Sequence, residues 1–106
     1  MSYRFMRVLV FFDLPTETTE DKRNYRKFRK LLIKSGFLML QESVYCRMLL
    51  TPGAGKSVID TLRRHKPPQG IVQILTVTEK QFSGIECITG EFHSEIIDSD
   101  ERLVIL

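Results

Sequence analysis

The sequence lacks tryptophan and contains only two cysteines and two histidines. Cys46 and Cys87 stand alone in apolar runs, without the close pairing of a zinc site or the density of a secreted disulfide scaffold. We therefore expect both to be reduced residues of the core. His65 and His93 have no serine, cysteine or histidine at a useful spacing, so neither predicts a catalytic triad or a metal centre. We expect both histidines on the surface.

Long apolar runs are also missing. No run approaches the roughly 18 residues that a membrane-spanning helix needs, and the N-terminal residues are not followed by a cleavage-type segment. The 42% of hydrophobic and 27% of charged residues are ordinary for a globular domain. We therefore expect a cytoplasmic protein without a membrane partner.

The length of the chain allows one hydrophobic core. A chain of 106 residues has too little interior to fill a second independent core. We expect a single domain over residues 1–106. Its core should cover about residues 1–78, and residues 79–106 should serve dimer formation or partner docking.

The net charge of +3 conceals an asymmetry along the chain. Residues 1–85 hold 15 basic and 7 acidic residues, a sum of +8, whereas residues 86–106 hold 1 basic and 6 acidic residues, a sum of −5. A basic body favours a polyanionic ligand. The acidic tail would either shield that body or dock on a basic protein partner.

The clearest strand is Phe5–Phe12, which is rich in β-branched and aromatic residues and stops before Asp13 and Pro15. Apolar residues point to both sides of this run, which predicts a central strand covered on both faces.

The clearest helix follows, with Thr18 as its N-cap, acidic residues in its first turn and Gly36 as its stop. Tyr25, Phe28 and Leu32 recur at helical spacing and predict its core side. The aromatic residues could instead stack on bases, as could Tyr45, but their spacing favours core packing. The basic residues on the remaining faces are Lys22, Arg23, Arg26, Lys27, Arg29, Lys30 and Lys34.

The remaining predicted elements of the core complete a known order of strands and helices. They are strands at residues 37–40 and 44–50, a helix at 54–65 and a strand at 71–78. The order β-α-β-β-α-β predicts an α+β, ferredoxin-like fold, with an antiparallel sheet and both helices on one face. Two short C-terminal strands, residues 85–88 and 103–106, would extend the sheet or cross to a neighbour. The bare sheet face needs either residues 79–106 or a partner chain, and a homodimer is the economical answer.

Seven cations between residues 22 and 34 exceed what Glu20 and Asp21 can neutralise. A row of such side chains favours binding to phosphate backbone that depends on salt and not on sequence. The alternative is a solvated helix face. Arg63, Arg64 and Lys66 rank lower, because they can merely complement the helix dipole. The candidate nucleic-acid ligands are Arg23, Arg26, Lys27, Arg29, Lys30 and Lys34.

Asp13 is the candidate metal ligand and catalytic residue, because it ends an apolar central strand. The alternative is a turn cap. One carboxylate holds Mg²⁺ poorly. Across a twofold axis, however, two copies of Asp13 could share one ion and activate water for phosphodiester cleavage.

Residues 53–57 (GAGKS) imitate part of a phosphate-binding loop between a strand and a helix. We reject that interpretation because the required first glycine would fall on Leu50. A flexible turn with Ser57 near the start of a helix explains the run better.

Several stretches in this order resemble the Cas-two (Cas2) family of CRISPR adaptation proteins, particularly its type II-A members. The resemblance covers nearly the whole chain. The stretches that carry it are Met1–Arg4, Phe12–Pro15, Tyr25–Lys30, Gln41–Tyr45, Thr76–Phe82 and Glu101–Val104.

The resemblance implies a ferredoxin-like homodimer that bridges two dimers of the Cas-one (Cas1) integrase during spacer acquisition. The Cas1 integrase performs the strand transfer. In this setting the basic residues from Arg23 to Lys34 would support the middle of a double-stranded DNA fragment, and the C-terminal strands would help to dock the integrase.

Many family members are also described as metal-dependent endonucleases that act on RNA or double-stranded DNA. The aspartate that ends the first strand serves as their metal ligand, which here is Asp13. The ion would be Mg²⁺ or Mn²⁺, at most one per dimer. Phe12 replaces the family's more usual tyrosine and so removes a hydroxyl group. Ser43 matches the family's Ser-Val pair and lies either near the metal or at a hairpin cap.

Three hypotheses follow from the sequence. The first is a structural DNA-binding adaptor in spacer acquisition, and the second is a metal-dependent phosphodiesterase that acts through Asp13. The third is a toxin-like RNA interferase of related fold, which nothing in the sequence favours. Reversing the charge of the basic helix and removing the Asp13 carboxylate separate the first two.

Overall fold

The computed structural model describes residues 5–90. Its elements, in chain order, are β1 (Met6–Asp13), α1 (Thr19–Lys34), β2 (Leu38–Gln41), β3 (Val44–Leu49), α2 (Pro52–Arg64), β4 (Ile71–Thr78) and α3 (Glu79–Phe82). The four strands form one antiparallel sheet in the order β2-β3-β1-β4. The predicted ferredoxin-like α+β fold is confirmed by this arrangement.

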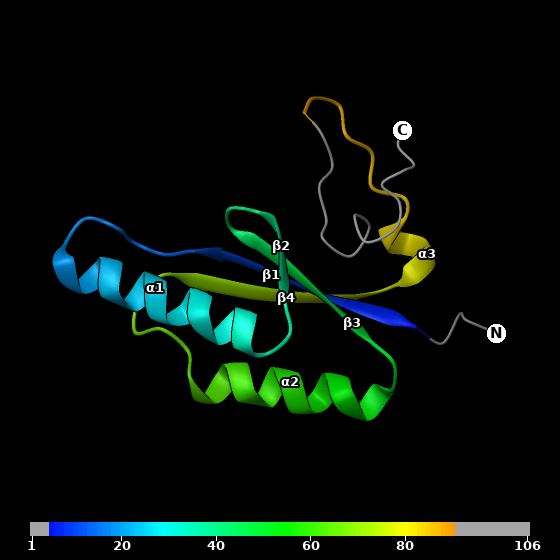
Figure 1. Cartoon of the computed structure of the whole chain (residues 1–106), viewed down its shortest axis with the longest axis horizontal. Helices are drawn as coiled ribbons and strands as arrows, with labels where there is room; N and C mark the ends of the chain where they lie inside the picture. The colour runs from blue at the N-terminus through cyan, green and yellow to red at the C-terminus, as the bar shows by residue number, and fades with distance from the viewer. Residues whose placement is uncertain (1–4, 91–106) are drawn as a thin grey trace.

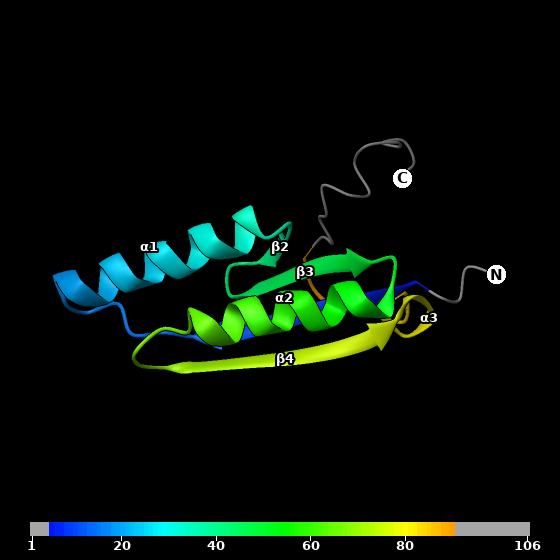
Figure 2. The same ribbon diagram turned by 90° about the horizontal axis from the view of Figure 1, so that it is seen from below.

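Strand β1 lies inside the sheet, between β3 and β4, as its apolar sequence predicts. Val10 pairs with Tyr45 of β3 on one side and with Ile74 of β4 on the other. Helices α1 and α2 pack on the same face, and α3 with residues 83–90 lies on the other side of the sheet (Figures 1 and 2). The second face therefore has only partial cover among residues 5–90.

Helix α1 has the bounds that its capping residues predict. The Thr18 hydroxyl accepts a hydrogen bond from the Asp21 backbone N–H, and the Asp21 carboxylate accepts one from the Thr18 N–H. This reciprocal capping box satisfies backbone donors that a helix leaves free at its start. At the other end, Gly36 adopts a φ of 92°, a conformation that favours glycine.

Helix α2 begins earlier than predicted, at Pro52 instead of residue 54, and ends at Arg64. The Thr51 hydroxyl caps it by accepting from the Ala54 N–H at 3.2 Å, and Pro52 suits the first turn because that position needs no N–H. Residues 53–57 are therefore helical, which corrects the predicted flexible turn. A Cβ on Gly55 would lie 2.8 Å from Leu49 Cδ1, so this glycine lets α2 approach β3 closely.

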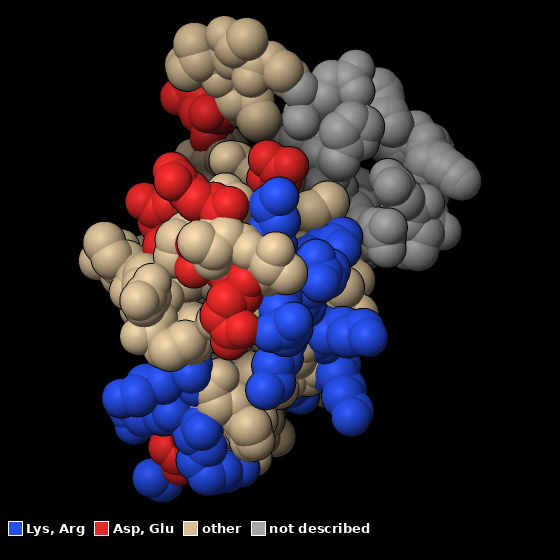
Figure 3. Space-filling view, turned by 90° about the vertical axis from the view of Figure 1, so that its left-hand side faces the viewer, with Lys and Arg blue, Asp and Glu red and all other residues tan. Residues whose placement is uncertain are grey.

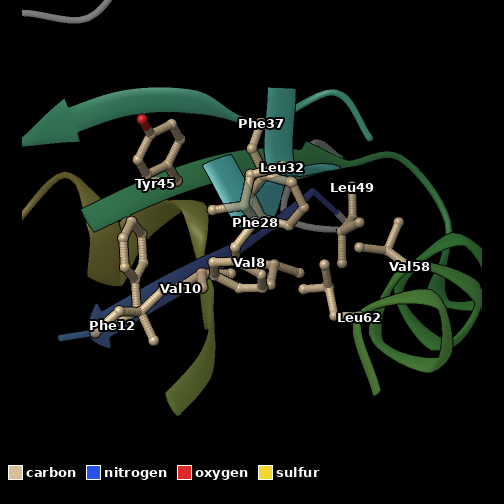
Figure 4. Packing of buried hydrophobic residues seen from close by; sticks show 11 residues of the cluster. Val8, Val10, Phe12, Phe28, Leu32, Phe37, Tyr45, Leu49, Val58 and Leu62 are labelled. Atoms are coloured by element: carbon tan, nitrogen blue, oxygen red, sulfur yellow. The ribbon is translucent and has the colours of Figure 1, made fainter. Parts of the chain in front are cut away.

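The main core lies between the sheet and the two helices (Figure 4). The Phe12 ring meets Tyr25, Phe28 and Tyr45 at centroid distances of 5.9, 5.3 and 5.6 Å. The three candidate stacking aromatics thus pack in or against the core, as their spacing favours. The buried members of this cluster are Val8, Val10, Phe12, Leu14, Phe28, Leu32, Phe37, Tyr45, Leu49, Val58 and Leu62.

A smaller core forms on the other face of the sheet, where Leu9, Cys46 and Phe82 are buried together. Phe82 belongs to α3, a short helix that the sequence analysis did not predict. Thr78 starts α3 with a second capping box, in which Gln81 is its partner. A single turn of helix thereby brings one aromatic ring onto the open face.

Two predictions for the C-terminal part are wrong. Residues 85–88 form no strand, since they follow α3 without pairing with any described strand. Cys87 is exposed and therefore is no core residue, whereas Cys46 is buried as expected, and both thiols are free. The predicted strand at residues 103–106 and His93 lie outside the described residues.

Across residues 5–90, no helix has the length and hydropathy needed to cross a bilayer.

Candidate nucleic-acid interface and strand-end carboxylate

The basic side chains of α1 are exposed and cover the sides of the helix that face away from the core. Because successive residues of an α-helix turn by about 100°, burial of Phe28 and Leu32 leaves these cations on the two flanks and on the outward side of the helix. Arg29 lies on the flank that faces β3, where its Nε donates to the Tyr45 hydroxyl at 2.8 Å. Lys27 lies on the opposite flank and lines a groove beside α2. Cations thus border α1 on both sides.

Little of this charge is neutralised within the described part of the chain. Arg23 pairs with Glu20 at 2.6 Å, and Asp21 is engaged in the capping box. No other cation of α1 forms an ion pair with a carboxylate of residues 5–90. In Figure 3 the positive side chains gather in two groups, over α1 and at the end of α2, with uncharged surface between them. A net positive surface therefore remains available for a polyanion.

Asp13 is exposed at the end of β1. Because side chains alternate along a strand, Asp13 shares a side with Leu9 and Phe11, which border the open face. Phe12 points the other way, into the main core. A tyrosine at position 12 would extend from the face of the sheet opposite Asp13. The presence of phenylalanine at this position therefore removes a hydroxyl group on the side away from Asp13.

Asp13 belongs to no cluster of three or more metal-ligating side chains within residues 5–90. Across residues 5–90, no three histidine, cysteine, aspartate or glutamate side chains come close enough to hold an ion together. One exposed carboxylate does not meet the ligand requirement of Mg²⁺. A complete ion site at Asp13 therefore needs oxygen atoms from elsewhere, such as a second chain, a phosphate group or water.

Ser43 lies in the turn between β2 and β3, beside the end of β1. Its backbone carbonyl accepts a hydrogen bond from the Phe12 N–H at 3.1 Å. This bond joins the hairpin turn to the residue before Asp13. Ser43 therefore has a structural contact near the strand end, in line with the interpretation that it belongs to the hairpin turn.

Gly70 also shapes the strand end. Its φ is +96°, and a Cβ built on it would lie 2.7 Å from both the Asp13 carbonyl oxygen and Leu14 Cδ2. Only glycine allows the start of β4 to lie this close to the end of β1 without strain. The positive φ could not be read from the sequence alone.

The open face also contains a buried arginine that the sequence analysis missed. Arg7 Nε and Nη2 donate to the two carboxylate oxygens of Glu79 at 2.8 and 2.9 Å. Arg7 Nη1 contacts Cys46 Sγ at 3.7 Å, and the guanidinium lies 4.2 Å from the centroid of the Phe82 ring. These contacts tie β1, β3 and α3 together on the side of the sheet opposite α1 and α2.

The electrostatics of this cluster follow from the ion pair. Hydrogen bonding with Glu79 raises the pKa of Arg7, and the same bonding lowers the pKa of the Glu79 carboxyl. Burial raises the pKa of the Cys46 thiol, against the opposing effect of Arg7. Cys46 therefore stays a neutral thiol, and Glu79 stays a carboxylate down to a lower pH than an isolated glutamate.

The fold and helix α1 define a small ferredoxin-like protein with an exposed basic surface. The family model described as "CRISPR associated protein Cas2" matches residues 6–85. The chain belongs to this Cas2 family of CRISPR systems, and the resemblance to the Cas2 family is confirmed.

Curated relatives agree with this assignment. The chain is 52% identical over 101 residues to the "CRISPR-associated endoribonuclease Cas2" of Treponema denticola, covering 95% of this chain and 100% of that protein. It is 46% identical over 101 residues to the protein of the same name from Streptococcus mutans, covering 95% and 93%. A solved structure described as "Crystal structure of cas2" shares the fold with a TM-score of 0.59 and 22% identity, covering 83% of this chain and 90% of that one.

Proposed function

We propose that this Cas2 protein is a DNA-binding adaptor in CRISPR spacer acquisition. As a cytoplasmic homodimer, it bridges two dimers of the Cas1 integrase and supports the middle of a double-stranded DNA fragment. Its body is a single domain, and residues 79–106 serve dimer formation and integrase docking. The observation that carries the proposal is the exposed basic surface of α1, whose cations are largely unneutralised within residues 5–90.

The ligands on α1 are the six predicted cations. Each phosphate that they neutralise releases counterions, which gives binding that weakens steeply with salt. Arg29 keeps N–H groups for phosphate beyond the one that it donates to Tyr45. The proposed contacts are Arg23, Arg26, Lys27, Arg29, Lys30 and Lys34.

The homodimer is supported by the apolar open face of the sheet. Ile71 and Leu75 of β4 are 57% and 51% exposed, and Ile85 and Ile88 beyond α3 are 48% and 85% exposed. A groove of about 710 Å³ lies on the same face, over Leu9 and Phe11 of β1. A second copy would bury this apolar surface, and burial of such surface is the main favourable term in association.

An integration assay tests the adaptor. Reversing Arg26, Lys27 and Lys30 to glutamate should abolish spacer integration by the purified Cas1 and Cas2 proteins, while Asp13→Ala should leave it intact. Integration that survives the charge reversal, with the triple variant folded and dimeric, would exclude the adaptor role of α1.

The second candidate function is a metal-dependent endonuclease, and the names of the relatives include the term endoribonuclease. It is favoured by the position of Asp13 at the exposed strand end, on the side of the proposed dimer interface. Two Asp13 carboxylates across a twofold axis would hold one Mg²⁺ or Mn²⁺, with Ser43 nearby. The ion would polarise a phosphodiester and lower the pKa of bound water. RNA and double-stranded DNA are the proposed substrates.

A cleavage assay tests this second candidate. The purified protein should cut RNA or duplex DNA with Mg²⁺ and stop with a chelator. Asp13→Ala should abolish cutting, while the dimer measured by analytical ultracentrifugation stays intact. Equal cutting by the wild type and the variant would identify a contaminating nuclease and end this candidate.

A further inference from the structure

Helix α1 faces a second set of basic residues across a groove. The groove lies between α1 and the C-terminal end of α2 and has a volume of about 330 Å³. Residues of α1 on its surface are Lys27, Phe28 and Leu31, and residues at the end of α2 are Arg64, His65 and Lys66. Figure 3 shows the two corresponding groups of positive side chains on either side of uncharged surface. Each side of the groove therefore carries positive charge, Lys27 on α1 and Arg64 and Lys66 at the end of α2, and the lining between them includes apolar residues.

The carboxylate nearest in sequence to Arg64 and Lys66 already pairs with other cations. Asp60 on α2 lies 3.8 Å from Lys56 Nζ and 3.5 Å from Arg63 Nη1. Within residues 5–90, Arg64 and Lys66 form no ion pair with any carboxylate. Arg63 and Arg64 both lie in the last turn of α2, and together with Lys66 their charge exceeds the partial negative charge, roughly half an elementary charge, at the end of this helix.

Thr61 orients the α2 wall. Arg64 Nη2 lies 3.4 Å from the Thr61 hydroxyl oxygen, and His65 Nδ1 lies 3.0 Å from the Thr61 carbonyl oxygen. Because a carbonyl can only accept, Nδ1 must carry the proton in the second contact. His65 Nε2 is then left for a ligand or water, and two side chains at the groove are tethered to one residue.

We propose that the groove between α1 and α2 binds one phosphate-backbone strand of duplex DNA, contacted by Lys27 from one wall and by Arg64 and Lys66 from the other. The inference rests on the proposed DNA-binding function and deepens it. It assigns the α2-facing flank of α1, rather than the flank beside Tyr45, as the centre of the contact. The α2 cations, which the sequence analysis ranked below those of α1, become part of the interface.

Charge complementarity selects this occupant. A backbone strand presents a continuous row of negative charges, and a groove with basic walls can neutralise several of them at once. Backbone contacts of this kind position a duplex without reading its sequence. An adaptor that accepts fragments of any sequence needs contacts of this type.

The test compares two double variants of α2 that lose the same charge. Arg64→Ala with Lys66→Ala removes two groove cations, whereas Lys56→Ala with Arg63→Ala removes the two cations that contact Asp60. The plot of log K against log salt for duplex DNA has a negative slope. We expect the magnitude of this slope to fall by about 2 in the first variant, because each phosphate contact contributes about 0.9. The control variant should keep the wild-type slope. Lys27→Ala should lower the slope by about 0.9 from the opposite wall.

The outcomes separate this inference from the proposed function. A wild-type affinity for duplex DNA that does not change with salt concentration would refute the DNA-binding function itself. A salt-dependent wild type whose slope falls with Arg26→Ala and Lys30→Ala but not with the groove variants would refute only the groove. Equal losses in the groove and control variants would also overturn it, because they would reflect net charge alone. Urea midpoints equal to the wild-type value verify that each variant is folded.

Discussion

Arg7 and Glu79 lie 72 positions apart in the sequence and meet through two hydrogen bonds of 2.8 and 2.9 Å. The Arg7 side chain is only 6% exposed, whereas the Glu79 side chain is 39% exposed. A guanidinium in this position depends on its carboxylate partner, because a buried charge without one carries a large desolvation cost. The pair therefore links the start of β1 to the start of α3.

Removal of the Glu79 carboxylate should destabilise the protein by about 1–3 kcal/mol, because Arg7 would remain buried without its partner. Equilibrium urea unfolding of Glu79→Ala measures this change. The exposed pair between Glu20 and Arg23 provides the control, since Glu20→Ala should cost less than about 1 kcal/mol. Similar losses in both variants would mean that burial of Arg7 has no energetic consequence.

The same pair makes stability depend on pH. The folded-state pKa of Glu79 is lowered, so its contribution is present above the unfolded-state pKa, about 4.3 for glutamate, and is lost as pH falls through the folded-state value. The difference in unfolding free energy between wild type and Glu79→Gln should therefore be largest near pH 7 and shrink below about pH 4. Urea titrations at a series of pH values test this. A difference that stays constant from pH 7 to pH 3 would contradict the assignment.

Gly70 and Gly53 should respond to alanine with opposite signs. Gly70→Ala forces a side chain onto a φ of +96° and within 2.7 Å of the Asp13 carbonyl, and should cost about 2 kcal/mol or more. Gly53 lies in the first turn of α2 with nothing within 4 Å of its Cβ position, so Gly53→Ala should stabilise by up to about 1 kcal/mol. Thermal unfolding of the two variants measures both effects. A neutral Gly70→Ala would mean that β4 can retreat from Asp13.

Tyr45→Phe should cost about 1 kcal/mol, because it removes the hydroxyl that accepts from Arg29 Nε at 2.8 Å. The ring stays in place against Phe12, so the core should remain intact. Urea unfolding measures the cost, and Arg29→Ala combined with Tyr45→Phe should cost little more than either change alone. Additive losses would show that the two side chains do not interact.

The sequence predicted the elements whose signals are local. The apolar run of β1 and the caps of α1 determine where these elements lie, because each depends on residues within a few positions. The start of α2 was missed, since Thr51 and Pro52 outweigh the two glycines that follow. The predicted strand at residues 85–88 was wrong, because an apolar run forms a strand only by pairing, and these residues pair with no strand of the described sheet.

The candidate site also combines features that local sequence predicts with features that depend on tertiary packing. Helical periodicity was enough to predict that the α1 cations are exposed. It could not predict that Lys27 faces Arg64 across a groove, because this contact depends on how two helices pack on one sheet. The burial of Arg7 was likewise hidden, since its partner Glu79 comes from the far end of the described chain.

The two cysteines differ in exposure and can therefore be used to follow unfolding by chemical labelling. Cys87 is exposed and Cys46 is completely buried. A maleimide dye should therefore react at a single position of an isolated folded subunit, beyond α3, and a second reaction should appear only when the chain unfolds. Counting modified thiols by mass spectrometry then reports the folded fraction of any variant without an engineered tag.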